Sequence, residues 1–218
     1  MKKHIKIIAR LFIPASIRAF LWRSIPSFHK VNTYLLKRNK PIQELSPINE
    51  NYYIQEVVWE DKEQLRKVES YRNAKAFEKK ILPRLRNPEW HGLAVFDKLT
   101  GDITYISWVV DSSIPYLEEF GIKMKAHQFL LKDGFCVPYY RHQGLHTRME
   151  QERINYCIRN GGNEIFIQIH ASNKRGIKSV TENGYRLFQQ NNIILWPIFF
   201  IYRSVKGFLK NPFKRIVT

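Results

Sequence analysis

The sequence predicts a mixed α/β domain, with helices on both faces of one sheet, over residues 51–202. The main observation is the order of the periodicities along this stretch, because alternating and helix-type apolar patterns follow one another repeatedly. The length of 218 residues fits one domain with appendages, and 44% hydrophobic residues are enough to bury a core. A disordered chain and a small disulfide-stapled scaffold are therefore excluded.

The predicted elements run in the order strand, helix, three strands, helix, strand, helix and two strands. Predicted strands cover 52–58, 92–96, 103–110, 129–137 and 164–170, with two more between 185 and 202. Predicted helices cover 60–85, which Pro83 is expected to close, 145–159 and 174–183. The segment with Pro115 and Gly121 is expected to be a substrate-specific insertion.

The positive charge lies at the two ends of the chain. The formal net charge is +17, yet residues 41–186 hold 21 basic against 19 acidic side chains. Residues 1–40 hold ten basic side chains and residues 187–218 hold five, and neither stretch contains an acid. A nucleic-acid partner is disfavoured, because such proteins carry basic residues on a folded face. The prediction is a basic N-terminal extension over 1–50, a nearly neutral domain over 51–202 and a basic tail over 203–218.

The N-terminal extension also has an amphipathic pattern. Apolar residues recur at spacings of three and four within 1–27, and Pro14 divides them into two short helices. Basic helices that carry aromatic residues suit the surface of an anionic membrane. Two alternatives stay open, namely that these helices pack on the body or that the ends form a homodimer contact. No stretch reaches the roughly 20 apolar residues of a membrane span, so we expect a peripheral location.

Two cysteines, Cys136 and Cys157, are too few for a disulfide framework or a zinc site. We therefore expect a reduced, cytoplasmic setting at the inner face of the membrane and no metal.

The most informative segment joins the strand that ends at Val137 to the helix that begins at Leu145. It reads Val137-Pro138-Tyr139-Tyr140-Arg141-His142-Gln143-Gly144-Leu145-His146. A glycine permits a tight turn there, and the unpaired amides of a helix N-terminus bind phosphate groups. The segment has neither the P-loop pattern nor the three glycines of a dinucleotide fingerprint.

A second block strengthens this interpretation. Asn173-Lys174-Arg175-Gly176-Ile177 follows a predicted strand, and Gly184-Tyr185 closes the next helix. Together the two blocks resemble the GNAT acyltransferase superfamily over about 129–186, and the element order over 51–202 agrees with that family. The resemblance implies a GNAT-like, mostly antiparallel sheet flanked by helices.

The resemblance also implies acetyl-CoA or another acyl-CoA as co-substrate. Its pyrophosphate would be held by the loop, and its pantetheine arm would pair like an extra strand with main chain near Phe135 and Val137. Asn173 would contact the thioester arm. The implied loop residues are Arg141, His142, Gln143, Gly144, Leu145 and His146. An uncharged amine would then attack the thioester directly.

Two positions depart from the family pattern. The loop normally closes with Gly or Ala where this chain has His146, whose ring would crowd the helix start or contact a phosphate. The family often has a Tyr that protonates the departing thiolate where this chain has Val180. The neighbouring hydroxyls of Ser179 and Thr181, or water, are the alternatives for that role.

Two candidates for the general base remain. Asp133 shares its side-chain direction with Phe135 and Val137 and is expected to face the cleft. His170 ends the neighbouring strand, and the pKa of a histidine suits proton removal near neutral pH. The alternatives are that Asp133 is a bulge residue and that His170 is a structural edge residue.

The predicted function is N-acyl transfer, most simply N-acetyl transfer, in a bacterial-type enzyme. The expected acceptor is a small-molecule or lipid-linked primary amine, such as an amino sugar at the inner membrane surface. One alternative takes the acyl group from an acyl carrier protein, whose acidic surface would match the basic ends. Another is a non-catalytic module that binds acyl-CoA.

Overall fold

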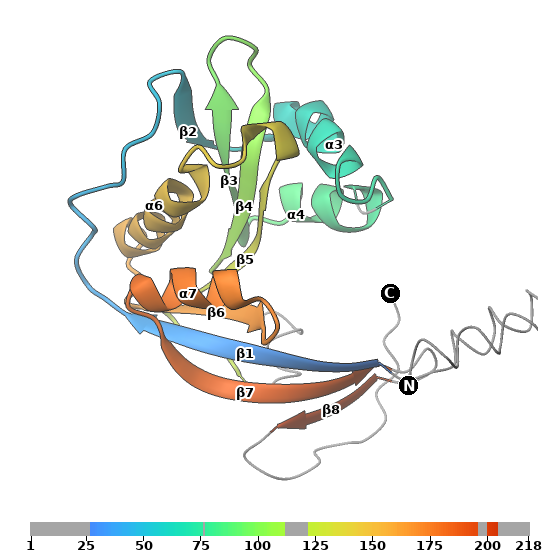
Figure 1. Cartoon of the computed structure of the whole chain (residues 1–218), viewed down its shortest axis with the longest axis vertical. Coiled ribbons are helices and arrows are strands. Elements are labelled where there is room, and N and C mark those ends of the chain that lie inside the picture. The colour runs from blue at the N-terminus through green and yellow to red at the C-terminus, as the bar shows by residue number, and fades with distance from the viewer. Residues whose placement is uncertain (1–26, 76, 112–121, 196–199, 205–218) are drawn as a thin grey trace, which may run out of the picture. The chain divides into compact units, whose positions relative to one another are not determined.

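The computed structural model describes residues 27–75, 77–111, 122–195 and 200–204 (Figure 1). Two compact units divide the chain, and each is described separately. The larger unit comprises residues 33–169 and 173–188, and the smaller one holds the other described residues. The two amphipathic helices predicted within 1–26, the insertion at 112–121 and the tail from 205 onward lie outside the described residues.

The strands are joined in one hydrogen-bonded order, β2-β3-β4-β5-β6-β1-β7-β8. Antiparallel pairing joins β2 to β5 in succession and also joins β7 to β8, whereas β5 and β6 are parallel. The strands are β1 (Ser27–Lys37), β2 (Tyr52–Glu56), β3 (Trp90–Asp97), β4 (Ile103–Val110), β5 (Gln128–Cys136), β6 (Glu164–His170), β7 (Arg186–Leu195) and β8 (Phe200–Ser204). The predicted mixed, mostly antiparallel sheet is confirmed.

Helices cover both faces of the larger unit's strands (Figure 1). One face carries η1 (Trp59–Asp61), α3 (Lys62–Ser70), η2 (Phe77–Ile81) and α4 (Leu82–Leu85). The other carries α6 (Leu145–Arg159) and α7 (Lys174–Glu182), and η3 (Pro138–Tyr140) lies between β5 and α6. All eight residues of β4 are buried, because both of its faces are covered.

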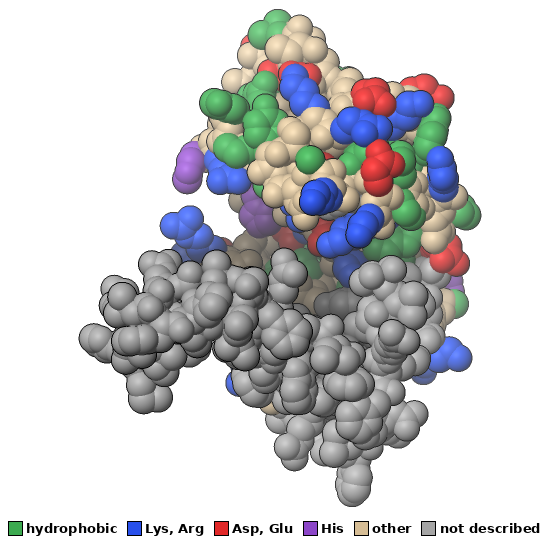
Figure 2. All heavy atoms as spheres, turned by 90° about the vertical axis from the view of Figure 1, so that its right-hand side faces the viewer, with side chains coloured by type: hydrophobic (Ala, Val, Ile, Leu, Met, Phe, Trp, Pro, Cys, Tyr) green, Lys and Arg blue, Asp and Glu red, His purple; other side chains and the backbone are tan. Residues whose placement is uncertain are grey.

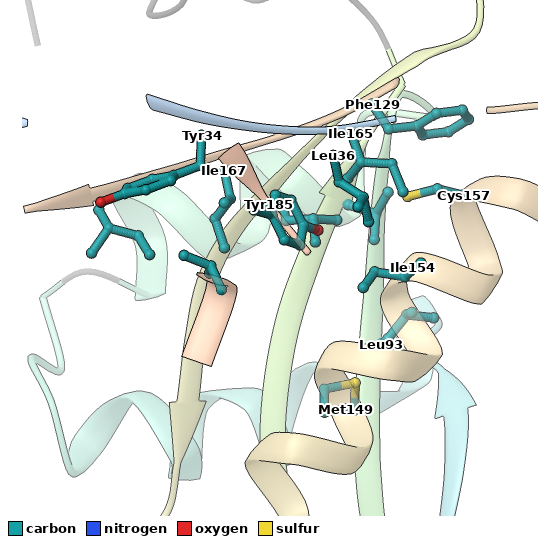
Figure 3. Packing of buried hydrophobic residues seen from close by; sticks show 14 of the residues in the cluster. Tyr34, Leu36, Leu93, Phe129, Met149, Ile154, Cys157, Ile165, Ile167 and Tyr185 are labelled. Carbon is teal, nitrogen blue, oxygen red and sulfur yellow. The ribbon is translucent and has the colours of Figure 1, made fainter. Parts of the chain in front are cut away.

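Two apolar clusters fill the space between the strands and these helices. The cluster under α6 and α7 includes Met149, Ile154 and Ile167, and Figure 3 shows α6 side chains pointing toward those of the strands. The cluster under α3 and η2 includes Leu65, Phe77 and Trp108. At about 25 cal/mol per Å² of apolar area, these clusters supply the main stabilising free energy of the fold.

Two elements differ from the sequence prediction. β1 lies inside the stretch predicted as the N-terminal extension, and its Tyr34 and Leu36 belong to the core of the larger unit. Its pattern was hidden because Asn32 and Thr33 are buried too, so that apolar and polar residues do not alternate. The single helix predicted over 60–85 is instead α3, η2 and α4, with Pro83 in the first turn of α4, where a missing N–H costs nothing.

Within the described residues, no helix combines the length and apolar character needed to cross a bilayer.

Candidate active site

The pairing between strands β5 and β6 ends halfway along β5. Their parallel pairing runs from Gln128 and Glu164 to Leu131 and Ile167 and ends there. Beyond Leu131, β5 remains paired with β4 on its other side. Among the described residues, no strand pairs with the side of β5 that faces away from β4 along 133–136, and this side is called the open edge of β5.

A β-bulge marks the same place. The register between β4 and β5 shifts between Ile106 and Trp108, and Asp133 has a φ of +50°. A non-glycine residue in the left-handed region is uncommon and often marks a functional position. The bulge bends β5 away from its former partner and turns the Asp133 and Gly134 peptide groups at the point of separation.

A cavity of about 150 Å³ lies where the strands have separated. Strand β5 contributes residues 131–134 to its lining, and β6 contributes residues 167–169. The lining is completed by His146, Glu150 and Arg153 of α6, by Gly176 and Val180 of α7, and by Asn173, the N-cap of α7. The cavity therefore brings together the two sequence blocks that predicted a site.

On the α4 side, Asp133 forms an ion pair with Arg84. The Arg84 Nη2 donates to Asp133 Oδ2 at 2.5 Å, and its guanidinium lies 4.4 Å from the ring centre of Trp90. Burial raises the pKa of Asp133, but the charge and hydrogen bond of Arg84 outweigh it, so the pKa lies below the usual value. Lys132 has its pKa lowered to about 8, mainly by burial.

The loop before α6 leads into the N-terminus of that helix and is held in place by hydrogen bonds. Gly144 is its N-cap at a φ of +74°, and His142 also has a positive φ of 65°. Arg141 Nε donates to the Cys136 carbonyl at 3.3 Å, and the Tyr52 hydroxyl donates to Gln143 Oε1 at 2.7 Å. These bonds hold both ends of the loop, while the first-turn amides of α6 have no intrahelical acceptors. Such a terminus binds anionic groups.

The His146 ring turns toward the sheet. Its Nδ1 shares a hydrogen bond of 2.7 Å with the buried Tyr105 hydroxyl, and its Nε2 lies 3.4 Å from Ser179 Oγ. His146 is exposed to solvent and lines the cavity. The predicted crowding of the helix start is therefore wrong, because the ring lies over Tyr105 at a centroid distance of 6.0 Å.

Comparisons with solved structures give this arrangement a context, while no family model and no curated protein sequence matches the chain. A GCN5-related N-acetyltransferase from Sphaerobacter thermophilus is 11% identical, with a TM-score of 0.56 over 91% of this chain and 59% of that one. A tandem GNAT protein from the clavulanic acid biosynthesis pathway is 12% identical, with a TM-score of 0.60 over 85% of this chain and 58% of that one. This chain has the GNAT acetyltransferase fold.

A third GNAT structure is a GCN5-related glucosamine N-acetyltransferase region of a fungal multi-domain GH3 β-N-acetylglucosaminidase. It is 6% identical, with a TM-score of 0.57 over 82% of this chain and 22% of that one. The chain thus spans less than three fifths of the length of these solved GNAT chains. At such identities the comparisons establish the fold.

The main chain at the end of β5 is hydrogen-bonded within the protein. The Val137 N–H donates to the Thr104 carbonyl at 2.9 Å, and the Val137 carbonyl accepts from the Tyr140 N–H at 3.0 Å. Both main-chain groups of Val137 therefore have a partner within the protein, and the pairing of a pantetheine arm near Phe135 and Val137 stays a prediction. Because peptide groups alternate along a strand, those of Phe135 face Ile106 on β4 and those of Cys136 face away from β4, where the carbonyl accepts from Arg141 Nε.

The other predicted residues fall in two places. Asn173 lines the cavity, where its Oδ1 accepts from the Gly176 N–H at 3.0 Å and caps α7. Ser179 does not line the cavity itself, but its Oγ contacts His146, which does. His170 belongs to the smaller unit, where its Nδ1 shares a hydrogen bond of 2.6 Å with Ser172 Oγ, and its catalytic role stays a prediction.

Sequence analysis missed a buried layer beneath the cavity. Glu150 and Arg153 form an ion pair with side chains 2% and 3% exposed, and Arg153 also interacts electrostatically with the Tyr105 side chain. The signal was available, since positions 146, 150 and 153 share one face of a helix. Arg84 and Tyr105 gave no such signal, because their sites form only when distant elements pack together.

The outer surface over α3 and α4 carries both signs of charge. Figure 2 shows Lys and Arg side chains interspersed with Asp and Glu there, with apolar side chains between them. Several form surface ion pairs, such as Arg66 with Glu63 and Glu78, and Lys67 with Asp102. In the part of the chain that the structure describes, no group of three or more His, Cys, Asp or Glu side chains is arranged to hold a metal ion.

Proposed function

We propose that the protein is an N-acyltransferase that moves an acyl group, most simply acetyl, from acyl-CoA to a primary amine. One observation carries the proposal. The open edge of β5, the bulge at Asp133 and the N-terminus of α6 adjoin one cavity in a GNAT fold. The helix N-terminus suits a pyrophosphate, and the Cys136 N–H, which faces away from β4, suits a carbonyl of an extended amide chain.

Transfer by this geometry needs no covalent enzyme intermediate. The amine nitrogen attacks the thioester carbon, the carbonyl oxygen gains charge, and the C–S bond then breaks with its electron pair going to sulfur. We assign stabilisation of the oxyanion to peptide N–H groups near the bulge. Among the side chains, Asp133 and His170 remain the candidates for removing the amine proton, and Ser179 a candidate for the acid.

We further propose an amino sugar or a lipid-linked amine as acceptor, used at a membrane surface. The support is the basic, amphipathic sequence of the chain ends together with the glucosamine-acetylating GNAT region among the similar structures. The proposed location is cytoplasmic and peripheral, at the inner face of the membrane. Sedimentation with anionic and neutral vesicles tests it, because electrostatic attachment requires binding to the anionic vesicles that salt weakens.

Calorimetric titration with acetyl-CoA tests the donor. Low-micromolar binding is expected for the natural chain and no binding for Gly144→Arg, whose side chain would cross the helix N-terminus. Gly101→Arg is the matched control, because Gly101 also has a positive φ, +70° against +74°, but lies in the β3–β4 hairpin with open space around it. Equal binding by both variants would refute the phosphate site.

Thiol release in the presence of glucosamine, and of vesicles containing phosphatidylethanolamine, tests the acceptor. Amine-dependent release supports acyl transfer. Absence of acetyl-CoA binding by the natural chain in calorimetry and thermal shift would instead favour a carrier-protein donor. Binding without release to any amine would favour a non-catalytic acyl-CoA-binding module.

A further inference from the structure

Three polar side chains from three elements form a row beside the cavity. Tyr105 comes from β4, His146 from the first turn of α6 and Ser179 from α7. The His146 Nδ1 lies 2.7 Å from the Tyr105 hydroxyl, and its Nε2 lies 3.4 Å from Ser179 Oγ. The ring is thus oriented at both nitrogens while remaining exposed in the cavity lining.

Gly134 places this row directly beneath the bulge of β5. A Cβ at Gly134 would lie 2.6 Å from the Tyr105 hydroxyl oxygen, so a glycine is required for the hydroxyl to reach this position. The Tyr105 hydroxyl in turn holds His146. The imidazole therefore stands below the point where β5 leaves β6, beside the buried side chain of Val180.

The two acidic side chains of the cavity are in ion pairs, and the cavity also contains Lys132, whose pKa burial lowers to about 8. Asp133 is paired with Arg84, and Glu150 is paired with Arg153. If either carboxylate accepted a proton, its arginine would be left without a counter-charge. His146 is held by hydrogen bonds alone, so a change in its protonation leaves no ion pair broken.

We infer that His146 carries a proton to the sulfur atom of the departing CoA, an inference that rests on the proposed acyl transfer. After the N–C bond has formed, Nε2 of the neutral ring, rather than Asp133 or His170, accepts the proton that the former amine nitrogen loses, directly or through water. The C–S bond breaks, sulfur keeps the electron pair, and the ring returns that proton to sulfur. The products are the amide and CoA thiol, and the ring ends neutral.

The surroundings of His146 keep the resting ring in the neutral form that this step needs. Partial burial lowers the pKa of His146, Glu150 acts in the opposite direction, and Arg153 lowers it further. Tyr105, on β4, stays protonated because burial raises the pKa of its hydroxyl. In the tautomer that the step needs, His146 Nδ1–H donates to the Tyr105 oxygen, which leaves the Nε2 lone pair for the transferred proton.

The first test needs no acceptor amine. The protein is titrated by NMR through its histidine side-chain resonances, free, with CoA and with dethio-CoA, which lacks only the sulfur. His146→Gln assigns the resonance. CoA is expected to shift the titration midpoint of His146, and dethio-CoA to leave it near that of the free protein.

Equal midpoints with the two ligands would overturn the inference, because His146 would then not sense the sulfur. If neither ligand binds the natural chain, the proposed function fails and this inference fails with it. If both bind and only the sulfur effect is missing, the proposed function stands and this inference alone is wrong.

A second test follows the thiol of bound CoA by its thiolate absorbance as pH rises. His146→Gln and His146→Ala are expected to raise the midpoint of the bound thiol by about one pH unit, since a donor to the thiolate is lost. His91→Gln is the control, because His91 pairs with Glu56 and Asp111 and is not a cavity residue. A midpoint unchanged in both His146 variants would contradict the role.

Discussion

Titratable side chains on the two faces of β5 have different partners, although both line the same cavity. On the α4 face, Asp133 is held ionised by Arg84, whose guanidinium also covers Trp90. On the α6 face, the neutral ring of His146 lies over the buried pair of Glu150 and Arg153. A fixed carboxylate suits orientation of a cationic or polar acceptor, whereas an uncommitted imidazole suits proton transfer. The comparison shows that the partner of a titratable side chain, more than its burial, indicates whether that side chain is suited to exchange a proton.

The largest expected effect tests the buried pair on the α6 face. Glu150→Gln should lower the free energy of unfolding by about 3–5 kcal/mol, because Arg153 is left buried without its counter-charge. The double variant Glu150→Met with Arg153→Leu should recover most of the loss. Urea unfolding measures both. A single variant as stable as the natural chain would show that the pair is not buried in solution.

A second prediction concerns the glycine between the two faces. Gly134→Val should cost about 1–3 kcal/mol, because its side chain would overlap the Tyr105 hydroxyl. The same change should displace His146 and weaken CoA binding. Combining Gly134→Val with Tyr105→Phe removes the overlapped oxygen and should restore part of the stability. Thermal melting and calorimetry with CoA are the measurements, and an additive loss in the double variant would argue against the contact.

On the α4 face, Arg84→Met should lower stability by about 1 kcal/mol at neutral pH, through the lost ion pair and the lost contact with Trp90. Asp133 would lose the partner that lowers its pKa, leaving burial to raise it. The natural chain keeps this contribution above the unfolded pKa of about 3.9 and loses it as pH falls through the lower folded value. The difference in stability between the variant and the natural chain should therefore become smaller below pH 4 in melting curves. A difference that does not change with pH would mean that the lost contact with Trp90 alone causes it.

The smallest effect is the pH dependence that His146 gives to stability. Its folded pKa lies below the unfolded value of about 6.5, so the unfolded chain binds more protons between the two values. Stability should be complete above pH 6.5 and fall as pH drops through this window. His146→Gln should flatten that part of the curve. Identical slopes for the two proteins in urea titrations would contradict the lowered pKa.

The sequence predicted the elements around the site better than their contacts. Helix α6 was predicted with its observed bounds, because its apolar spacing is helical from Leu145 to Arg159. Strand β1 was missed because the buried Asn32 and Thr33 interrupt the alternation of apolar and polar residues along it. The row of Tyr105, His146 and Ser179 joins residues far apart in the chain, so no local spacing in the sequence predicts it. The commitment of the Val137 peptide groups likewise depends on strand register, which one strand alone does not define.

Hydrogen exchange of backbone amides with and without acetyl-CoA tests the central claim, that acyl-CoA binds along the open edge of β5. The account predicts protection of amides in 132–136 and in the first turn of α6, with the β2–β3 pair unchanged. Binding of acetyl-CoA without added protection at either place would contradict it.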